Sequence, residues 1–589
     1  MPLDHPAAAL LRPWRSAAVG SGVAAVALVL GVPLFLRSPP WCDLTLYELA
    51  ARNLLAGGVH YRDVFDTNTP GFVWALAGVR VVVGPSWEAV KAVDLLIVAG
   101  ITGGLVRLAR YGGATPAGRA WLVAGVAVLY PSLPEPNHCQ RDVWMLLPAL
   151  AAVLLRLGGR GEAKGAESRP ALPRPPSAVV EGVLWGLAVW VKPHVVVPAA
   201  AVWLATARRE SWGRDLAGNL LGGLAVGLVG VGYLLASGTW PYFVEVFTVW
   251  NTGYAAKMWN ELPVRYEIEF HYFPPWSYLH LLALPVAFLT LADDWWQVTP
   301  RLPGWLWAPP ADSRQRAARV ALAALYLGWA AQALYLQRQM HYVHVPEVLL
   351  LLALLAAHRW AVVPLAVGWL AVVPLLIALP PDVSGAGALP GNDAGWKSRH
   401  PLADPSRLKL WTACVRPAKS DQERAALWDR LAQVRGFHAA ADWTELDELA
   451  AELRRRGVRD GELLCWDDSP HALYLLLGRQ PGFRFLHVNQ MREIGPDQDA
   501  RLMAELCQVA PRVRWVAADL LYVCPPAPDS PESLADAGPD RLPRRLNPSL
   551  RANFPYYLPA VFRTGAGRGR YVLFTLPSPS AIRECGQGP

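Results

Sequence analysis

Asp43 is the first residue of this 589-residue chain whose position suggests chemistry. It follows closely after an apolar run, Ala17 to Leu36, so the edge of a membrane would partly desolvate its carboxylate. A carboxylate in such a place is suited to remove a proton from an attacking hydroxyl group. An acid there could also serve only to keep an external loop hydrated. We treat Asp43 as a candidate catalytic base.

The segment after Asp43 holds more side chains suited to a polar substrate. Carboxylates accept hydrogen bonds, and a phenol both donates and accepts them. The candidates for substrate binding are Glu48, Tyr61, Asp63 and Asp66. Each acid could equally be a solvated loop residue, so the types of residue alone do not decide between the two interpretations.

A second acid, Asp142, opens a later apolar run in Gln140-Arg141-Asp142. Taken alone, Asp142 fits a helix cap. We expect it on the same membrane face as Asp43, where two carboxylates could hold a divalent ion or divide the roles of base and orienting group. Asp43 and Asp142 are therefore the candidate metal ligands as well as the candidate catalytic pair, and Arg141 is a candidate for substrate binding.

Cationic side chains interrupt other apolar segments. Lys192 and His194 form the tip of a short apolar hairpin, and Arg338 and His341 lie between two later runs. A charge at membrane depth is costly and by default marks a site. Phosphate groups bind such donors, Arg in bidentate fashion and Lys as a point charge. The alternative is that these side chains reach out to lipid headgroups.

The seven cysteines contain no CxxC and no Cys/His spacing typical of a zinc site, and their odd number leaves no complete disulfide framework. Cys42 and Cys139 each precede a candidate acid, so a disulfide between them would bring Asp43 near Asp142. Free buried cysteines are common, and the sequence leaves this pairing open.

Apolar helices must position these residues. Hydrophobic residues make up 53% of the chain and charged residues 17%, and the mean hydropathy is +0.22. The apolar runs fill residues 17–379 and then stop. Because about 20 apolar residues span a bilayer, the pattern predicts a polytopic α-helical membrane protein with about 11 spans. The run over residues 71–83 is too short for a full crossing, and we expect it to be re-entrant or interfacial.

The basic residues predict the orientation. They gather in short loops between the runs, as expected for the cytoplasmic face, so the net charge of +8 does not indicate a nucleic-acid partner. This predicts a multi-pass protein of the inner cell membrane. Its N-terminus is expected in the cytoplasm. The loops expected on the extracytoplasmic face are residues 37–69, 131–141, 237–275 and 337–344.

A different pattern follows the last apolar run. Residues 380–410 are rich in Gly, Pro, Asp and Ser and read as a linker, and residues 411–589 alternate between helical and strand periodicity, which predicts an extracytoplasmic α/β domain. The pattern contains no Gly-rich phosphate loop and no metal signature. Helices are expected over residues 444–456, 470–477 and 497–509, and strands over residues 462–466, 483–488, 513–517 and 571–576.

The order of these features resembles the GT-C superfamily of membrane glycosyltransferases, nearest to the branch with protein O-mannosyltransferases and lipid A aminoarabinose transferases (glycosyltransferase family 39-like). The resemblance covers most of the chain. Its motifs are Asp43 after the first span, Tyr47, the run 51–57, Tyr61-Arg62-Asp63 through Thr69-Pro70-Gly71, Arg141-Asp142, Trp190-Val191-Lys192-Pro193, His341-Tyr342 and Trp466 to Arg479.

The resemblance implies a polyprenyl-phosphate sugar donor in the bilayer and transfer to an acceptor hydroxyl of a protein, lipid or glycan. Asp43 would take the hydroxyl proton with inversion at the anomeric carbon, and Lys192 and Arg338 would stabilise the departing phosphate. Asp142 and Asp66 would orient the acceptor or a divalent metal ion. The competing class is a multispan transporter or flippase, which also needs buried charge; transporters usually show internal repeats of their spans, and this sequence shows none.

Overall fold

The computed structural model describes residues 17–158, 175–207, 209–253, 273, 276–296, 310–337, 340–358, 405–434, 439–492, 496–524, 541–543 and 546–585. Several predicted features lie outside these residues. They are the span over residues 361–379, most of the linker, and Arg338.

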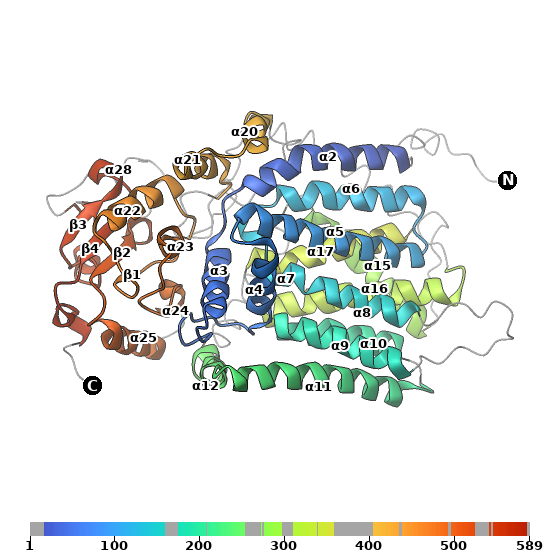
Figure 1. Ribbon diagram of the computed structural model, residues 1–589. Coiled ribbons are helices and arrows are strands. Elements are labelled where there is room, and N and C mark those ends of the chain that lie inside the picture. The colour runs from blue at the N-terminus through green and yellow to red at the C-terminus, as the bar shows by residue number, and fades with distance from the viewer. Residues whose placement is uncertain are drawn as a thin grey trace.

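A bundle of apolar helices forms one part of the molecule (Figure 1). Four of its helices, α2, α5, α11 and α16, are long and apolar enough to cross a membrane. Helices suit this sequence because they satisfy every backbone polar group within the segment. The bundle contains α2 (Ala17–Arg37), α5 (Trp87–Tyr111), α6 (Pro116–Ser132), α8 (Leu146–Gly158), α9 (Pro175–Val191), α10 (Val196–Thr206), α11 (Trp212–Ala236), α15 (His280–Trp296), α16 (Ser313–Leu336) and α17 (Val345–Ala357).

Polar contacts define the two ends of the bundle. At the end away from the tail, Arg156 of α8 pairs with Glu181 of α9 at 2.7 Å and with Asp215 of α11 at 2.9 Å. At the end that faces the tail, Arg37 pairs with Glu88 at 2.5 Å, which joins the last residue of α2 to the first turn of α5. The end of α2 and the start of α5 therefore lie at the tail-facing end, and the end of α8 lies with the starts of α9 and α11 at the other end.

Two helices lie across the tail-facing end of the bundle instead of along it (Figure 1). They are α3 (Cys42–Leu55) and α4 (Gly71–Val83). The segment over residues 37–69 was expected to be a loop, and α3 corrects this in part. At about 1.5 Å per residue, the 13 residues of α4 span about 20 Å, which is short of a bilayer crossing. The re-entrant or interfacial position expected for it stays a prediction.

The tail holds a four-stranded sheet in the order β1-β2-β4-β3, counted over the residues that the structure describes. Strands β1 and β2 are parallel, and the other two pairs are antiparallel. The elements are α20 (Trp411–Val415), α21 (Asp421–Leu431), α22 (Trp443–Arg455), β1 (Leu463–Cys465), α23 (Ala472–Leu477), α24 (Val488–Arg492), α25 (Pro496–Val509), β2 (Trp515–Asp519), β3 (Ala560–Arg563) and β4 (Tyr571–Thr575).

One strand prediction in the tail is wrong. Residues 483–488 alternate in polarity but form no strand. Phe483 and Phe485 bury their rings in a cluster with Phe65 and Trp250 of the membrane part, and the Phe65 N–H donates to the Arg484 carbonyl at 2.9 Å. The alternation therefore reflects packing against the membrane part. Conversely, β3 was not expected; it is a short edge strand whose apolar residues are only partly buried.

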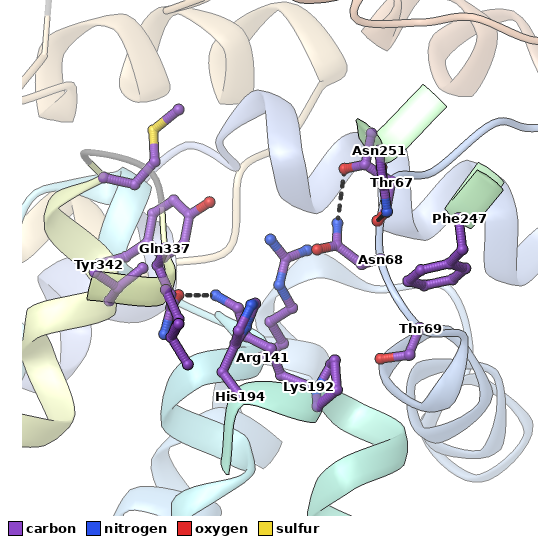
Figure 2. A pocket seen from close by; sticks show the side chains of 14 residues that line it. Thr67, Asn68, Thr69, Arg141, Lys192, His194, Phe247, Asn251, Gln337 and Tyr342 are labelled. Atoms are coloured by element: carbon purple, nitrogen blue, oxygen red, sulfur yellow. Dashed lines mark hydrogen bonds between the residues drawn. The ribbon is translucent and has the colours of Figure 1, made fainter. Parts of the chain in front are cut away.

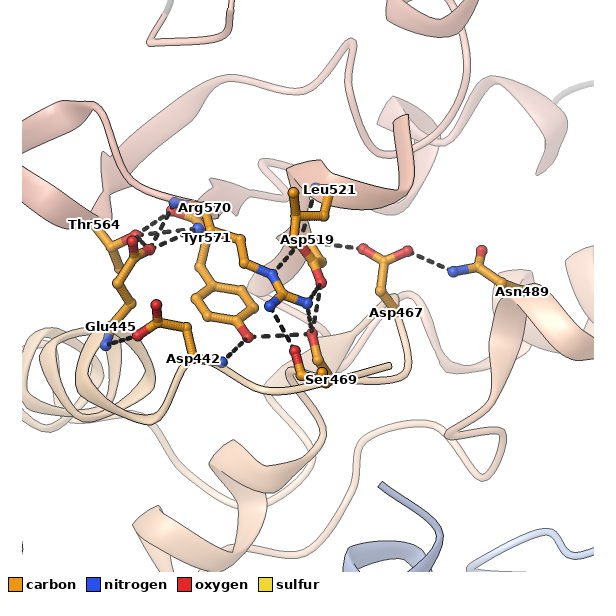
Figure 3. A network of polar contacts seen from close by, with 11 residues as sticks. Asp442, Glu445, Asp467, Ser469, Asn489, Asp519, Leu521, Thr564, Arg570 and Tyr571 are labelled. Atoms are coloured by element: carbon orange, nitrogen blue, oxygen red, sulfur yellow. Dashed lines mark hydrogen bonds and ion pairs between the residues drawn. The ribbon is translucent and has the colours of Figure 1, made fainter. Parts of the chain in front are cut away.

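A buried polar network ties the strand ends of the tail together (Figure 3). The Arg570 guanidinium donates to Asp519 at 2.8 Å, and Ser469 donates to the same carboxylate at 2.7 Å. Asp467 accepts from the Asp519 N–H at 2.5 Å and from Asn489 at 2.8 Å. These bonds link the loop after β1 to the end of β2 and the start of β4.

The cysteines pair differently from the arrangement considered in the sequence. Cys507 of α25 and Cys585 form a disulfide in the tail. Cys42 and Cys139 are both free and buried, so no disulfide brings Asp43 toward Asp142.

Candidate functional site

Asp43 lies in the first turn of α3, at the boundary between the bundle and the tail. Its side chain is 19% exposed. The Gln140 amide donates to Asp43 Oδ2 at 3.3 Å, and Nε2 of His487, from the tail, lies 4.0 Å from Oδ1. Asp43 therefore sits where loops of the bundle and a residue of the tail meet.

Tyr47 lies one helical turn after Asp43 and thus on the same face of α3. Its phenol accepts a hydrogen bond from the Arg141 guanidinium, whose carbon lies 5.5 Å from the ring centroid. Burial raises the pKa of Tyr47 well above its usual value, so the phenol stays neutral. Nε of Arg141 is buried and has no hydrogen-bond partner among the described residues. The Tyr47 contact fixes the position of the guanidinium, and its Nε–H remains available to donate to another group.

Lys192 occupies an extended position between α9 and a short turn that begins at Pro193. The proline ends α9, because a residue before proline is forced out of the helical region. Lys192 Nζ lies 2.8 Å and 2.9 Å from the two carboxylate oxygens of Asp142 and also donates to Gln337. Both charged groups are almost fully buried. Asp142 is therefore the partner of Lys192.

Asp142 does not cap its helix. The cap position of α7 (Arg141–Trp144) is Gln140, and its side chain makes no cap hydrogen bond. Asp142 also lies outside the group of donor atoms that gather around Asp43 in the described chain. Lys192 Nζ contacts both oxygens of Asp142, and a metal site shared by Asp43 and Asp142 stays a prediction.

A polar cavity of about 290 Å³ opens beside these residues (Figure 2). Arg141, Lys192 and His194 line it, facing residues 67–69 and Phe247 on one side and Gln337 and Tyr342 on the other. The described lining residues include two basic side chains, Arg141 and Lys192, and no carboxylate. Nδ1 of His194 is buried without a hydrogen-bond partner in the described chain. The cavity can therefore receive an anion.

A second, larger cavity of about 770 Å³ lies between α9, α10 and α11. Its walls are mostly apolar and include Trp185, Trp190 and Trp203. Thr69 lines both cavities, so the two cavities are neighbours at this residue. The Thr69 hydroxyl donates to the Val191 carbonyl at 3.2 Å, immediately before Lys192.

Gly71 allows the close approach that places Thr69. A Cβ at this position would lie 2.4 Å from the Trp190 carbonyl oxygen, which real contacts do not allow. Only glycine therefore lets the start of α4 pack against the end of α9. The Thr69-Pro70-Gly71 motif thus brings the first external segment to the tip of the hairpin.

Glu48, predicted to bind substrate, forms ion pairs with two arginines. Its carboxylate is fully buried and accepts from Arg52 and from Arg80, each at 2.6 Å. Arg80 belongs to α4, so Glu48 joins α3 to α4. Both carboxylate oxygens of Glu48 are engaged by arginines, and a role of Glu48 in substrate binding stays a prediction.

Three other predicted residues shape the loop between α3 and α4 instead of lining the cavity. The Tyr61 hydroxyl donates to the Asn68 carbonyl at 2.6 Å. Asp66 accepts from the Asn68 side chain at 2.6 Å, and Asp63 accepts from the Val59 N–H at 2.7 Å. They set the course of residues 67–69, which form the cavity wall.

The remaining cationic candidates are only partly placed. His341 is buried next to Tyr342, with ring centroids 6.0 Å apart, and is not among the residues that line the cavity. Arg338 lies outside the described residues. The structure adds Gln337 and His487, which sequence reasoning missed, and places Tyr342 of the His341-Tyr342 motif in the cavity wall. Neither the amide nor the tail histidine stands out by residue type or spacing.

Three solved structures show what this chain is similar to. Archaeal oligosaccharyltransferase AglB from Archaeoglobus fulgidus, in complex with an inhibitory peptide and a dolichol-phosphate, is 11% identical with a TM-score of 0.41, over 86% of this chain and 70% of that chain. ArnT from Cupriavidus metallidurans bound to undecaprenyl phosphate is 14% identical with a TM-score of 0.48, over 95% and 98%. ArnT in the apo state is 14% identical with a TM-score of 0.48, and the match covers 98% of this chain and 100% of that chain.

No protein-family model and no curated protein matches the chain.

Proposed function

We propose that this protein is an integral membrane glycosyltransferase that moves a sugar from a polyprenyl-phosphate donor to an acceptor hydroxyl group. The observation that carries the proposal is the pair of neighbouring cavities whose walls share Thr69. A polyprenyl phosphate has an anionic head and a long apolar chain. The cationic cavity fits the head, and the apolar cavity between α9, α10 and α11 fits the chain.

The charges in the polar cavity support phosphate binding. Asp142 neutralises Lys192, so Arg141 supplies the excess positive charge next to it. A guanidinium can bind phosphate in bidentate fashion, while the ammonium acts as a point charge. Arg141, Lys192 and His194 are therefore the proposed phosphate ligands. They would stabilise the negative charge that develops on the leaving phosphate.

Asp43 is the proposed catalytic base. It does not line the polar cavity, but its charge is close enough to interact with Lys192, and Gln140 connects it to Arg141 along the chain. In the reaction, the acceptor oxygen would form a bond to the anomeric carbon as its proton passes to Asp43. The bond from that carbon to the phosphate oxygen would break, and polyprenyl phosphate would leave with the electron pair, giving inversion.

The tail-facing end of the bundle is the proposed extracytoplasmic side. Arginines such as Arg110, Arg156 and Arg319 lie at the opposite end, which is the expected cytoplasmic arrangement. The disulfide Cys507–Cys585 supports an oxidising surrounding for the tail. The N-terminus would then be cytoplasmic, and the protein would sit in the inner membrane with its tail outside.

The proposal is tested with purified protein in lipid nanodiscs and a polyprenyl-phosphate sugar that carries labels in both the lipid and the sugar. We expect release of polyprenyl phosphate together with labelled sugar on an acceptor or, slowly, on water. Substituting Arg141→Gln should lower this release by at least about tenfold, as is usual when a donor to developing charge is lost. Arg512→Gln, an exposed arginine of the tail, is the matched control.

Transport would give a different result. A transporter or flippase would move the intact labelled lipid or solute across a sealed vesicle without releasing polyprenyl phosphate. That outcome would contradict the proposed function.

A further inference from the structure

The backbone carbonyl of Val29 lies in α2, a helix long and apolar enough to cross a membrane. In an α-helix this carbonyl accepts from the N–H four residues later, and that residue is Pro33, which has no N–H. A backbone group without a partner is costly in lipid. The indole N–H of Trp411 donates to the Val29 carbonyl at 3.0 Å. A residue far along the chain thus replaces the hydrogen bond that the proline removes.

Trp411 opens the short helix α20, which follows α19 (Pro405–Leu408). Figure 1 shows α20 beside the tail-facing part of α2. Two further bonds fix its position, because the guanidinium of Arg37, the last residue of α2, donates to the carbonyls of Cys414 and Arg416 at 3.3 Å each. The end of α20 is therefore held at the level of Arg37, and its start is held deeper along α2.

The depth of the Val29 contact places it in the hydrocarbon. Val29 lies eight residues before Arg37, which is about 12 Å along the helix. The headgroup region is only about 5 to 8 Å thick on each side of a bilayer. With the charged Arg37 at the headgroups, Val29 lies below them. Its side chain is 61% exposed, and those of Val26 and Leu28 are also exposed, as expected for a lipid-facing surface.

The segment over residues 405–416 carries its own exposed apolar side chains. Leu408 and Val415 are 37% and 54% exposed, and they are the only large apolar side chains exposed in the described chain from residue 405 onward. Val415 lies four residues after Trp411 and so on the same face of α20. Lys409 and Arg416 are exposed next to them. Apolar residues with a tryptophan and flanking basic residues are typical of segments at a membrane interface.

Another face of the segment packs against protein. Cys414 is buried in a cluster with Leu34 of α2 and with Leu427 and Leu431 of α21. Helix α21 belongs to the tail, so α20 connects the tail to α2. The segment is thus attached to the protein on one side, while Leu408 and Val415 remain uncovered on the other.

We propose that residues 405–416 insert into the leaflet on the tail side as a lipid-contacting anchor, with Trp411 bound to the carbonyl that Pro33 leaves free. The partner of the exposed face is lipid. Leu408 and Val415 contact acyl chains, and Lys409 and Arg416 extend to the phosphates of the headgroups. The anchor fixes the height of the tail above the membrane through α21. It requires that α2 crosses the membrane and does not depend on sugar transfer.

A nitroxide label at Val415→Cys measures the surroundings of the exposed face in the full-length protein in liposomes. The free cysteines of the described chain are buried, and labelled wild type gives the background. We expect frequent collisions of the label with O₂ and few with a water-soluble Ni²⁺ chelate, as at Leu28→Cys on α2. Arg512→Cys, an exposed position of the tail, should show the opposite preference.

A double-mutant cycle tests the contact that holds the anchor. Trp411→Phe keeps an aromatic ring but loses the donor, so amide hydrogen exchange of residues 405–416 should become about threefold to tenfold faster. Pro33→Ala gives the Val29 carbonyl a helical partner, so adding Trp411→Phe to it should change exchange by a clearly smaller factor. Trp212→Phe, at the exposed start of α11, is the control and should leave these residues unchanged.

Two results would overturn the anchor. One is a label at Val415→Cys that collides with the Ni²⁺ chelate as often as the label at Arg512→Cys, which would place the segment in water. The other is a label that neither reagent reaches, which would show that a protein surface covers this face. An equal effect of Trp411→Phe with Pro33 and with Pro33→Ala would overturn the role of the free carbonyl. If a variant of the cycle does not fold, the labels still decide.

Discussion

Lys192 and Asp142 show how a buried charge can serve both the fold and the site. Each is almost fully buried, and Asp142 holds Lys192 with both of its oxygens. Removing one partner of such a pair leaves an uncompensated charge, which typically costs about 3 to 5 kcal/mol. Loss of activity in a Lys192 variant alone would therefore not separate phosphate binding from simple unfolding.

A double substitution makes that separation. Lys192→Gln should lower the thermal stability of the purified protein markedly, because Asp142 is left unpaired. Adding Asp142→Asn removes the orphaned charge and should restore most of the stability. The double variant should still release polyprenyl phosphate at least about tenfold more slowly than the wild type, because a donor to the leaving phosphate is gone. A stable double variant with wild-type release would exclude Lys192 as a phosphate ligand.

At this scale the sequence predicted the cationic side of the site better than the acidic side. Lys192 and Arg141 were identified because a charge next to an apolar run is costly, and both line the cavity. Glu48 pairs with Arg52, a partner that the sequence already offered four residues later on the same helix face. Its second partner, Arg80, comes from a separate helix, and no local pattern could reveal that contact.

Single elements explain where the sequence was misleading. The segment over residues 37–69 reads as a loop because it is polar, yet residues 42–55 form α3 across the end of the bundle. In the tail, the helix predicted over residues 470–477 is confirmed, with Gly478 in the left-handed conformation at its end. Residues 483–488 have the same alternation as a strand. An alternating pattern shows which side chains are buried. It does not show whether the backbone of the segment pairs with a neighbouring strand.

The polar network around β1 and β2 predicts a pH dependence. Burial, with the Asp519 carboxylate next to it, raises the pKa of Asp467 from 3.8 to about 8. Between these values the folded tail holds a proton that the unfolded chain releases, so its stability falls as the pH rises. The contribution is fully present below about pH 4 and is lost as the pH passes about 8. Hydrogen exchange of the β1 and β2 peptides, corrected for intrinsic rates, measures the opening free energy of the tail at each pH.

Asp467→Asn should flatten the dependence of the opening free energy over that range. The comparison variant is Asp442→Asn, because burial raises the pKa of Asp442 only to about 6. This second variant should alter the profile below about pH 6 and leave the upper part intact. A profile in Asp467→Asn that matches the wild type would show that another group binds the proton.

At the scale of the whole molecule, the tail completes the surroundings of Asp43. Arg484 of the tail pairs with Glu245 of α12 (Trp240–Glu245) at 2.7 Å, and its guanidinium lies over the rings of Phe65 and Phe485. The tail histidines His471 and His487 reach α3 directly. We therefore expect the docking of the tail to control the order of the α3 N-terminus.

Arg484→Gln tests this coupling. The variant loses the ion pair with Glu245, so amide hydrogen exchange in residues 42–47 should become faster and sugar transfer slower. Arg514→Gln, an exposed arginine of the same domain that pairs with Glu462 at 3.5 Å, should change neither. Unchanged exchange at α3 in Arg484→Gln would show that the tail does not order this helix.

The global arrangement could be predicted from the sequence further than the site could. Hydropathy and the basic loops indicate which helix ends share a side, and Asp43, Arg141 and Lys192 all lie at the tail-facing end, as expected. The role of His487 could not be foreseen, because its contact with α3 depends on how two separately folded parts dock. Contacts of that kind leave no periodic signal in either segment.

The substitution Asp43→Asn tests the central claim most directly. Asparagine keeps the size and the Gln140 contact but cannot accept the proton of an attacking hydroxyl, and loss of a general base typically costs about 10² to 10⁴-fold in rate. We predict that the variant inserts and melts like the wild type and binds polyprenyl phosphate equally well, while sugar transfer falls by this factor. Wild-type transfer by a folded Asp43→Asn protein would contradict the account.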